Sequence, residues 1–275
     1  MTTPETSETV GGMALHLGQL TRCKMIATDG VLTIEQHGIC CPIDHLSMKR
    51  ADRGVTVTDP SGQMHLDLVE HLFSALGGLG IRSGIRIQTE DRELPLLDGG
   101  SLQWAKALRK LRIPSSAPTM RIVGTGTITV GASTYELMEA DSYDYGVSID
   151  IKHAQILETT SQWNGSASDF IDRIASARTF GFMNEAAALR ETSRARGANL
   201  KDVVVLCDDG SSISDPKPMP DECVRHKLLD LIGDWNLWAG LPLGKIRAHR
   251  PGHQANYEAA RRSISEGLVQ RVGTR

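Results

Sequence analysis

The segment CVRHKLLDLIGDW, residues 223–235, carries His226, Asp230 and Asp234 at four-residue intervals. In a helix, residues four and eight positions apart lie on one face, and Lys227 would lie at the edge of that face. A solvent-exposed face would more commonly carry Glu and Lys pairs, because His and Asp are poorer helix formers. These residue types therefore indicate a chemical role for the face.

A second group with reactive side chains is Glu70 and His71, in VEHLFSALGGLG. Adjacent helical residues point in different directions, so one can bind an ion while the other acts as a base. Catalytic zinc sites commonly use three His or Asp/Glu ligands and leave a fourth position for water. His71, His226 and Asp230 would supply such a set, and Glu70 would take a proton from the water. Spacing alone is a modest signal, and a His–Asp surface pair remains an alternative.

Two further stretches contain candidate residues. HRPGHQAN, residues 249–256, places His253 in a Pro-Gly turn, from which its imidazole can reach into a cleft. SARTFGF, residues 176–182, predicts a helix end with basic and hydroxyl side chains. Each has a simpler explanation, because loop histidines are commonly solvated and Arg178 can stabilise a helix C-terminus.

Taken together, the motifs resemble one family in their chain order. VEHLFSALGGLGI, ELPLLDGGS, ARTFGFM, DECVRHKLLDLIGDW and PGHQAN are similar to motifs of the UDP-3-O-acyl-N-acetylglucosamine deacetylases (LpxC). These are bacterial metal-dependent enzymes of lipid A biosynthesis. The resemblance extends from about residue 69 to residue 260. It implies a hydrolase that cleaves a linear amide.

The resemblance assigns the same metal ligands as the spacing does, namely His71, His226 and Asp230, with Glu70 as the general base. It implies that His253 steadies or protonates the leaving amine. Zinc is the default ion for this ligand set, although Fe²⁺ also suits it.

Other roles come from the resemblance alone. Asp234 would orient the catalytic histidine of the PGHQAN loop, as a partner outside the ligand set. Substrate would be bound by Thr179, Phe180, Lys227 and Arg250.

The segment after the FGF motif departs from the family. The family has an insert there that lines a passage for the acyl chain, whereas MNEAAALRETSRARGANLKD, residues 183–202, is basic. Its cations are Arg190, Arg194, Arg196 and Lys201. Buried cations without partners are costly, so such a segment lines a lipid passage poorly. Alternatively, the cations face solvent while apolar residues line the passage; these would be Ala186, Ala187 and Leu189.

The departure leads us to expect a paralogue that removes an N-acetyl or other N-acyl group from an amino sugar or nucleotide sugar without the long acyl chain. Such a substrate would be a nucleotide sugar or an intermediate of natural-product biosynthesis. One alternative is the lipid A enzyme itself, acting on UDP-3-O-acyl-N-acetylglucosamine. A second is a non-catalytic relative that binds sugar nucleotides.

Composition narrows the class of partner. The 275 residues are 40% hydrophobic and 23% charged, with a net charge of −3, which predicts a small-molecule substrate and no nucleic acid. The sequence contains no stretch of about 20 consecutive apolar residues, so we expect no transmembrane segment. The five cysteines lack C-x-x-C spacing, which favours reduced thiols and a cytoplasmic location. The oligomeric state is left open.

The elements that must position these residues alternate along the chain. Apolar periodicity and Gly/Pro punctuation predict strands at 31–36, 54–59, 84–89, 121–130, 134–139, 145–151 and 203–207. Helices are predicted at 68–80, 101–111, 167–176 and 221–239. IPSSAPT, residues 113–119, predicts a linker, so we place one domain at 1–117 and a second at 118–275. We expect an α+β two-domain sandwich, each domain a β-sheet backed by helices, with the active site between the domains.

Overall fold

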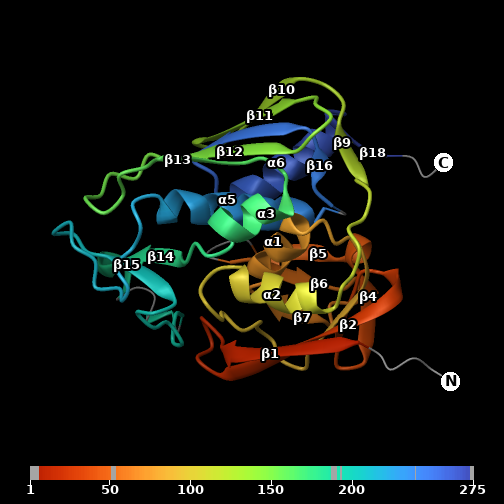
Figure 1. Cartoon of the computed structure of the whole chain (residues 1–275), viewed down its shortest axis with the longest axis horizontal. Coiled ribbons are helices and arrows are strands. Elements are labelled where there is room, and N and C mark those ends of the chain that lie inside the picture. Colours follow the sequence, from red (N-terminus) through yellow and green to blue (C-terminus); the bar gives the residue numbers. More distant parts are fainter. Residues whose placement is uncertain (1–5, 51–53, 187–190, 193, 239, 273–275) are drawn as a thin grey trace.

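The computed structural model describes residues 6–50, 54–186, 191–192, 194–238 and 240–272 of the chain. Two five-stranded sheets form its outer layers, and helices lie between them (Figure 1). The predicted α+β class is confirmed.

The first sheet has the strand order β1-β2-β8-β3-β4. Neighbouring strands are antiparallel except for β8 and β3. Side chains alternate along β8, so Ile85 and Ile87 are buried. Its strands are β1 (Ser7–Met13), β2 (Leu20–Val31), β3 (Thr33–Gln36), β4 (Ile39–Pro42) and β8 (Ser83–Gln88).

Two helices and a small sheet complete this half of the chain. Helices α1 (Glu70–Gly78) and α2 (Leu102–Lys110) pack against each other, and α2 contacts β1. A three-stranded antiparallel sheet leads into α1; after the turn η1 (Ile43–His45), it contains β5 (Ser47–Arg50), β6 (Thr56–Thr58) and β7 (His65–Asp67).

The second large sheet repeats the pairing pattern of the first. Its order is β10-β11-β17-β12-β13, and β17 and β12 form its parallel pair. Helices α5 (Glu222–Asn236) and α6 (His253–Ser265) pack on it. Its strands are β10 (Gly126–Val130), β11 (Ser133–Met138), β12 (Asp144–Ser148), β13 (Thr160–Trp163) and β17 (Lys245–His249). Helices α1 and α5 therefore hold equivalent places in the two halves.

Helices α1 and α5 pack closely in the middle of the molecule (Figure 1). Every residue of α5 except Lys227 is buried. A side chain at Gly233 would place its Cβ 2.2 Å from the carbonyl oxygen of Glu70, so only glycine permits this approach. The contact brings the first turn of α1, with Glu70 and His71, against α5.

The remaining elements surround this centre. A two-stranded parallel sheet pairs β14 (Thr179–Phe182) with β15 (Val203–Leu206), and η3 (Met183–Glu185) lies between them in sequence. A three-stranded sheet contains β9 (Met120–Ile122), β16 (Pro242–Leu243) and β18 (Val269–Arg271). The short helix α3 (Ala167–Asp169) continues into the π-helical turn η2 (Phe170–Ile174).

Two predicted elements differ from the structure. Residues 121–130 are not one strand, because β9 and β10 are separate strands in different sheets. Residues 167–176 form α3 and η2 in place of a regular helix. The domain boundary at 117/118 stays a prediction. Within the part of the chain described, no helix combines the length and apolarity needed to cross a membrane.

Candidate active site

The predicted site residues come together around a cavity of about 510 Å³ between the two halves of the chain. Its volume lies in the usual range for small-molecule sites. Of the predicted residues, only Asp234 does not line it. Those that do are Glu70, His71, Thr179, Phe180, His226, Lys227, Asp230, Arg250 and His253.

The proposed metal ligands form a buried cluster. His71, His226 and Asp230 each offer a ligand atom, and these atoms all lie within 4.8 Å of one another. Asp230 Oδ1 is 3.4 Å from His226 Nε2. Two atoms held about 2.0–2.2 Å from one tetrahedral ion would be separated by roughly 3.3–3.6 Å, so this spacing fits a shared ion.

The hydrogen bonds of His226 and Asp230 leave one atom of each side chain able to ligate a cation. His226 Nδ1 donates to the carbonyl oxygen of Ala177 at 3.0 Å, so Nε2 is the ring nitrogen left to face Asp230. Asp230 Oδ1 is buried and makes no hydrogen bond within the described residues. An ion held between the three side chains would satisfy this acceptor.

The protonation states also fit metal binding, which needs neutral imidazole and ionised carboxylate. Burial, reinforced by the charge of His226, lowers the pKa of His71 to about 3. Burial is also the main cause that lowers the pKa of His226. Burial alone would raise the pKa of Asp230, but the charges of His226 and Lys227 outweigh it and lower that pKa. At neutral pH the three groups therefore have the protonation states that a cation requires.

The carboxyl group of Glu70 lies beside this cluster and lines the same cavity. Its Oε2 accepts a hydrogen bond from the backbone N–H of Val55 at 3.0 Å, which fixes the carboxyl group. Its Oε1 is 4.0 Å from His253 Nε2. Burial raises the pKa of Glu70 to about 7, against the opposing charge of His253. A carboxyl group with such a pKa is matched to proton transfer near neutrality.

His253, the first residue of α6, faces Glu70 across the cluster. Its Nδ1 donates to Asp234 Oδ2 at 2.9 Å, and its Nε2 lies 3.9 Å from Asp230 Oδ2. Burial alone would lower the pKa of His253, but the charges of Asp234 and Asp230 raise it to about 10. The imidazole is therefore an oriented cation that can donate a proton.

Asp234 is itself held in place beneath the cavity. It is completely buried, and its Oδ2 also accepts a hydrogen bond from Asn256 Nδ2 at 2.7 Å. The side-chain oxygen of Asn256 accepts from the hydroxyl of Tyr135 at 2.7 Å. This chain fixes the carboxylate that binds His253, and its position explains why Asp234 does not line the cavity.

The predicted substrate-binding residues surround the cluster at two depths. Lys227 Nζ donates to Asp230 Oδ2 at 2.9 Å and lies 5.4 Å from the centroid of the Phe180 ring. The Thr179 backbone N–H donates to the carbonyl oxygen of Gly99 at 2.7 Å, which holds β14 against the first half. These residues form the wall beside the cluster.

Arg250 lies at the rim of the cavity. Its side chain is 52% exposed and its Nη1 is 3.7 Å from Asp150 Oδ2. The guanidinium therefore remains accessible to an anion at the entrance.

His16 is among the cavity residues that the sequence prediction did not name. Its backbone N–H donates to Glu93 Oε1 at 2.7 Å, and the next residue, Leu17, donates to Glu93 Oε2 at 2.9 Å. The buried Glu93 carboxylate thus shapes the loop that presents His16 to the cavity. Its signal in the sequence is the block GMALHLG, which resembles a family motif near the start of the chain.

The basic segment 183–202 has a mixed placement. Arg196 and Lys201 are exposed, whereas Ala195 and Ala198 line the cavity. Arg190, Ala187 and Leu189 lie outside the described residues.

Comparisons with known proteins agree with the motifs. The family model described as LpxC: UDP-3-O-acyl N-acetylglycosamine deacetylase matches residues 2–265. The protein named UDP-3-O-acyl-N-acetylglucosamine deacetylase from Brucella melitensis biotype 2 (strain ATCC 23457) is 30% identical over 270 residues, covering 94% of this chain and 93% of that protein. Proteins of the same name come from Pseudomonas entomophila, with 28% identity over 93% of this chain and 87% of the relative, and from Myxococcus xanthus, with 30% identity over 78% and 69%.

Proposed function

Because the chain belongs to the LpxC family of UDP-3-O-acyl-N-acetylglucosamine deacetylases, we propose that it hydrolyses the N-acetyl amide of a nucleotide-linked amino sugar. The observation that carries the proposal is the buried cluster of His71, His226 and Asp230, with Glu70 and His253 beside it. An oriented base, an oriented acid and a cation site on one cavity are the groups that amide hydrolysis needs.

The residues divide the reaction between them. A divalent ion held by the cluster would supply a Lewis acid that polarises the amide carbonyl and acidifies water. Glu70 takes a proton from the water as its oxygen adds to the carbonyl carbon. His253 then gives a proton to the amide nitrogen as the C–N bond breaks, and the products are acetate and a free amine. Thr179 and Lys227, which line the cavity beside the cluster, would stabilise the negative charge that develops on the carbonyl oxygen.

We expect His253→Ala to lower kcat by about 10²-fold or more and to leave metal binding largely unchanged. The substitution removes the oriented cation, but His253 is outside the proposed ligand set. Turnover and metal content of the same preparation would be measured in parallel. Asp234→Asn is the matched variant, because it keeps the imidazole and removes its ionised partner; we expect a smaller loss. An unaltered rate in His253→Ala would contradict the assigned role.

The apolar part of the cavity supports a substrate that carries an acyl chain. Leu15, Leu68 and Val203 form a small apolar cluster apart from the main core, and all three line the cavity. With Ala195 and Ala198 beside them, they offer an alkyl chain a surface on which burial is favourable. Arg196 and Lys201 are exposed, so their charges do not have to be buried beside a bound acyl chain. The relatives' names fit the same substrate, UDP-3-O-acyl-N-acetylglucosamine.

One observation favours the second candidate, an N-acyl amino sugar or nucleotide sugar without the long chain. The backbone N–H groups of Arg196 and Gly197 donate to the carbonyl oxygens of His16 and Leu15, at 3.3 and 2.9 Å. Residues 196 and 197 of the basic segment are thereby held against Leu15 and His16, which line the cavity. Held there, the segment would shorten the room for an acyl chain.

Amine release from two substrates in parallel tests the proposal. UDP-N-acetylglucosamine with and without the 3-O-acyl chain would be offered to the zinc-loaded protein, together with a panel of N-acetyl amino sugars. We expect kcat/KM to be greatest for the acylated compound. Turnover confined to an unacylated compound would favour the paralogue. If the zinc-loaded protein hydrolysed none of these compounds, the proposed deacetylase function would be contradicted.

A further inference from the structure

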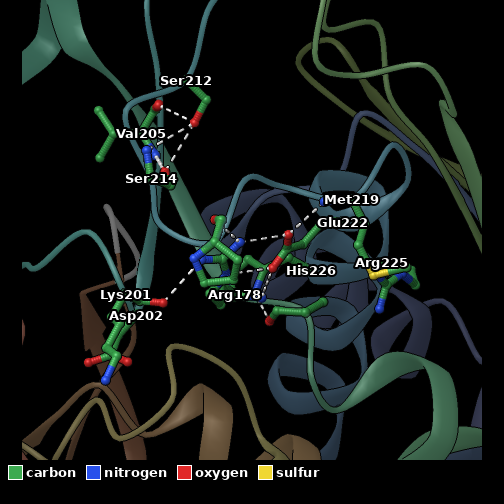
Figure 2. Close-up of polar contacts among 12 residues, drawn as sticks. Arg178, Lys201, Asp202, Val205, Ser212, Ser214, Met219, Glu222, Arg225 and His226 are labelled. Atoms are coloured by element: carbon green, nitrogen blue, oxygen red, sulfur yellow. Dashed lines mark hydrogen bonds and ion pairs between the residues drawn. The ribbon is translucent and has the colours of Figure 1, made fainter.

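A buried ion pair joins Arg178, the residue before β14, to Glu222 in the first turn of α5 (Figure 2). Helix α5 carries two of the proposed metal ligands, His226 and Asp230. Arg178 and Glu222 are 7% and 4% exposed. Arg178 Nε donates to Glu222 Oε1 at 2.7 Å, and Nη2 donates to Oε2 at 3.1 Å. Burying two charges is costly even when they are paired, so stability alone does not explain the pair.

The pair adjoins the hydrogen bond that orients His226. Glu222 lies one helical turn before His226 on α5, and Arg178 directly follows Ala177. The carbonyl oxygen of Ala177 is the acceptor for His226 Nδ1. The backbone N–H of Arg178 also donates to Glu222 Oε1, at 3.1 Å. The carboxylate of Glu222 thus ties the main chain at 177–178 to the helix that bears His226.

The remaining bonds of the guanidinium fix it from the other side. Nη1 donates to the carbonyl oxygen of Lys201 at 3.1 Å (Figure 2). Nη2 donates to the carbonyl oxygen of Pro216, also at 3.1 Å. Glu222 Oε2 accepts a further hydrogen bond from the backbone N–H of Met219 at 3.1 Å. The backbone groups of Lys201, Pro216 and Met219 therefore hold the pair in one defined position.

We propose that Arg178 and Glu222 are positioning residues that hold the Ala177 carbonyl against His226 Nδ1 and thereby keep Nε2 directed at the metal. Metal-ligating histidines depend on the acceptor bound to their second ring nitrogen. A lysine at position 178 could not reproduce the forked bonds of the guanidinium. The inference rests on the proposed metal site.

The test separates positioning from stability with the double variant Arg178→Met/Glu222→Met. Replacing both charges by apolar side chains of similar volume commonly preserves stability. We expect a folded double variant with zinc affinity lowered about tenfold, measured by chelator competition. We also expect an altered visible spectrum after Co²⁺ loading, because ligand-field bands report the geometry of the ligands. Unchanged affinity and an unchanged spectrum in the folded variant would overturn the proposal.

Arg225→Met is the matched control. Arg225 is also buried and precedes His226, but it pairs with Asp221 at 2.9 Å and donates to the carbonyl oxygen of Arg173 at 2.6 Å. The Arg225→Met variant should be less stable than the wild type and should bind zinc with wild-type affinity. A loss of affinity equal to that of the double variant would assign the effect to general destabilisation and overturn the proposal.

A second variant keeps the test decisive if the double variant does not fold. Arg178→Lys keeps a cation beside Glu222 but loses the fork, and we expect weaker zinc binding and an altered Co²⁺ spectrum from it too. Wild-type zinc affinity in this variant would contradict the positioning role. Failure of the proposed metal site itself would be seen in a separate comparison of the wild type with the Asp230→Ala variant. Equal zinc affinities of these two proteins would show that the site is wrong.

Discussion

Glu70→Gln is expected to lower kcat about 10²- to 10⁴-fold while the protein keeps its metal. Glutamine has the same shape and can still accept the hydrogen bond that Val55 donates to Glu70 Oε2. It cannot take a proton from water, however, so only the base is removed. Single-turnover rates, with bound zinc measured in the same sample, would show whether the loss is in the chemical step.

The neighbouring residue supplies the comparison for this experiment. His71→Ala should lose both metal and turnover, whereas Glu70→Gln should lose turnover alone, although the two residues are adjacent on α1. Retention of substantial turnover by the Glu70→Gln variant would show that another group is the base. Loss of metal from that variant would place Glu70 among the ligands.

Part of the site could be predicted because it depends on one helix. The spacing of His226 and Asp230 is a local property of α5, so their convergence follows from helical geometry without knowledge of the fold. His71 is different, because its approach to them depends on the packing of α1 against Gly233. That contact joins distant parts of the chain, so no local pattern could place His71 beside the other two. His71 entered the predicted ligand set because it has a residue type that catalytic zinc sites use, and the resemblance to a family assigned it the same role.

The features that were missed depend on the backbone of other segments. The local sequence around Arg178 indicates only a helix end. Its proposed positioning role depends on Glu222 and on the carbonyl oxygens of Lys201 and Pro216, and no local pattern relates these distant residues to Arg178. The strand predicted at 121–130 failed for a similar reason, since β9 and β10 differ in their partners more than in their residue types. Strand partners are set by tertiary structure.

The repeated topology explains why the site lies between the halves. Each half places one helix, α1 or α5, at the centre of the molecule and each of these helices carries proposed ligands. Neither half alone supplies three ligands, because His71 belongs to the first half and His226 and Asp230 to the second. A bound ion would therefore join the two halves, and metal removal is expected to lower the thermal stability of the whole chain.

Asp230→Ala is expected to weaken zinc binding more than about 100-fold and to abolish turnover at ordinary zinc concentrations. The substitution removes the only carboxylate in the proposed ligand set. Removing a ligand should reduce zinc affinity more than removing a residue that only holds a ligand in place. Chelator competition on the purified protein would give the affinity. Added zinc should restore little activity, because the ion would be held by two histidines without the charge that balances it.

Lys227→Met separates the loss of the ligand from the loss of an ion pair. Asp230 also accepts a hydrogen bond from Lys227 Nζ at 2.9 Å, so Asp230→Ala removes two interactions at once. Lys227→Met removes the ion pair and the contact of the ammonium with the Phe180 ring, but it leaves the carboxylate for the metal, so zinc affinity should stay close to that of the wild type. Turnover should still fall, because Lys227 lies in the cavity wall where the reacting carbonyl is proposed to bind. Equal losses of zinc affinity in the two variants would mean that the ion pair, and not metal ligation, is what Asp230 provides.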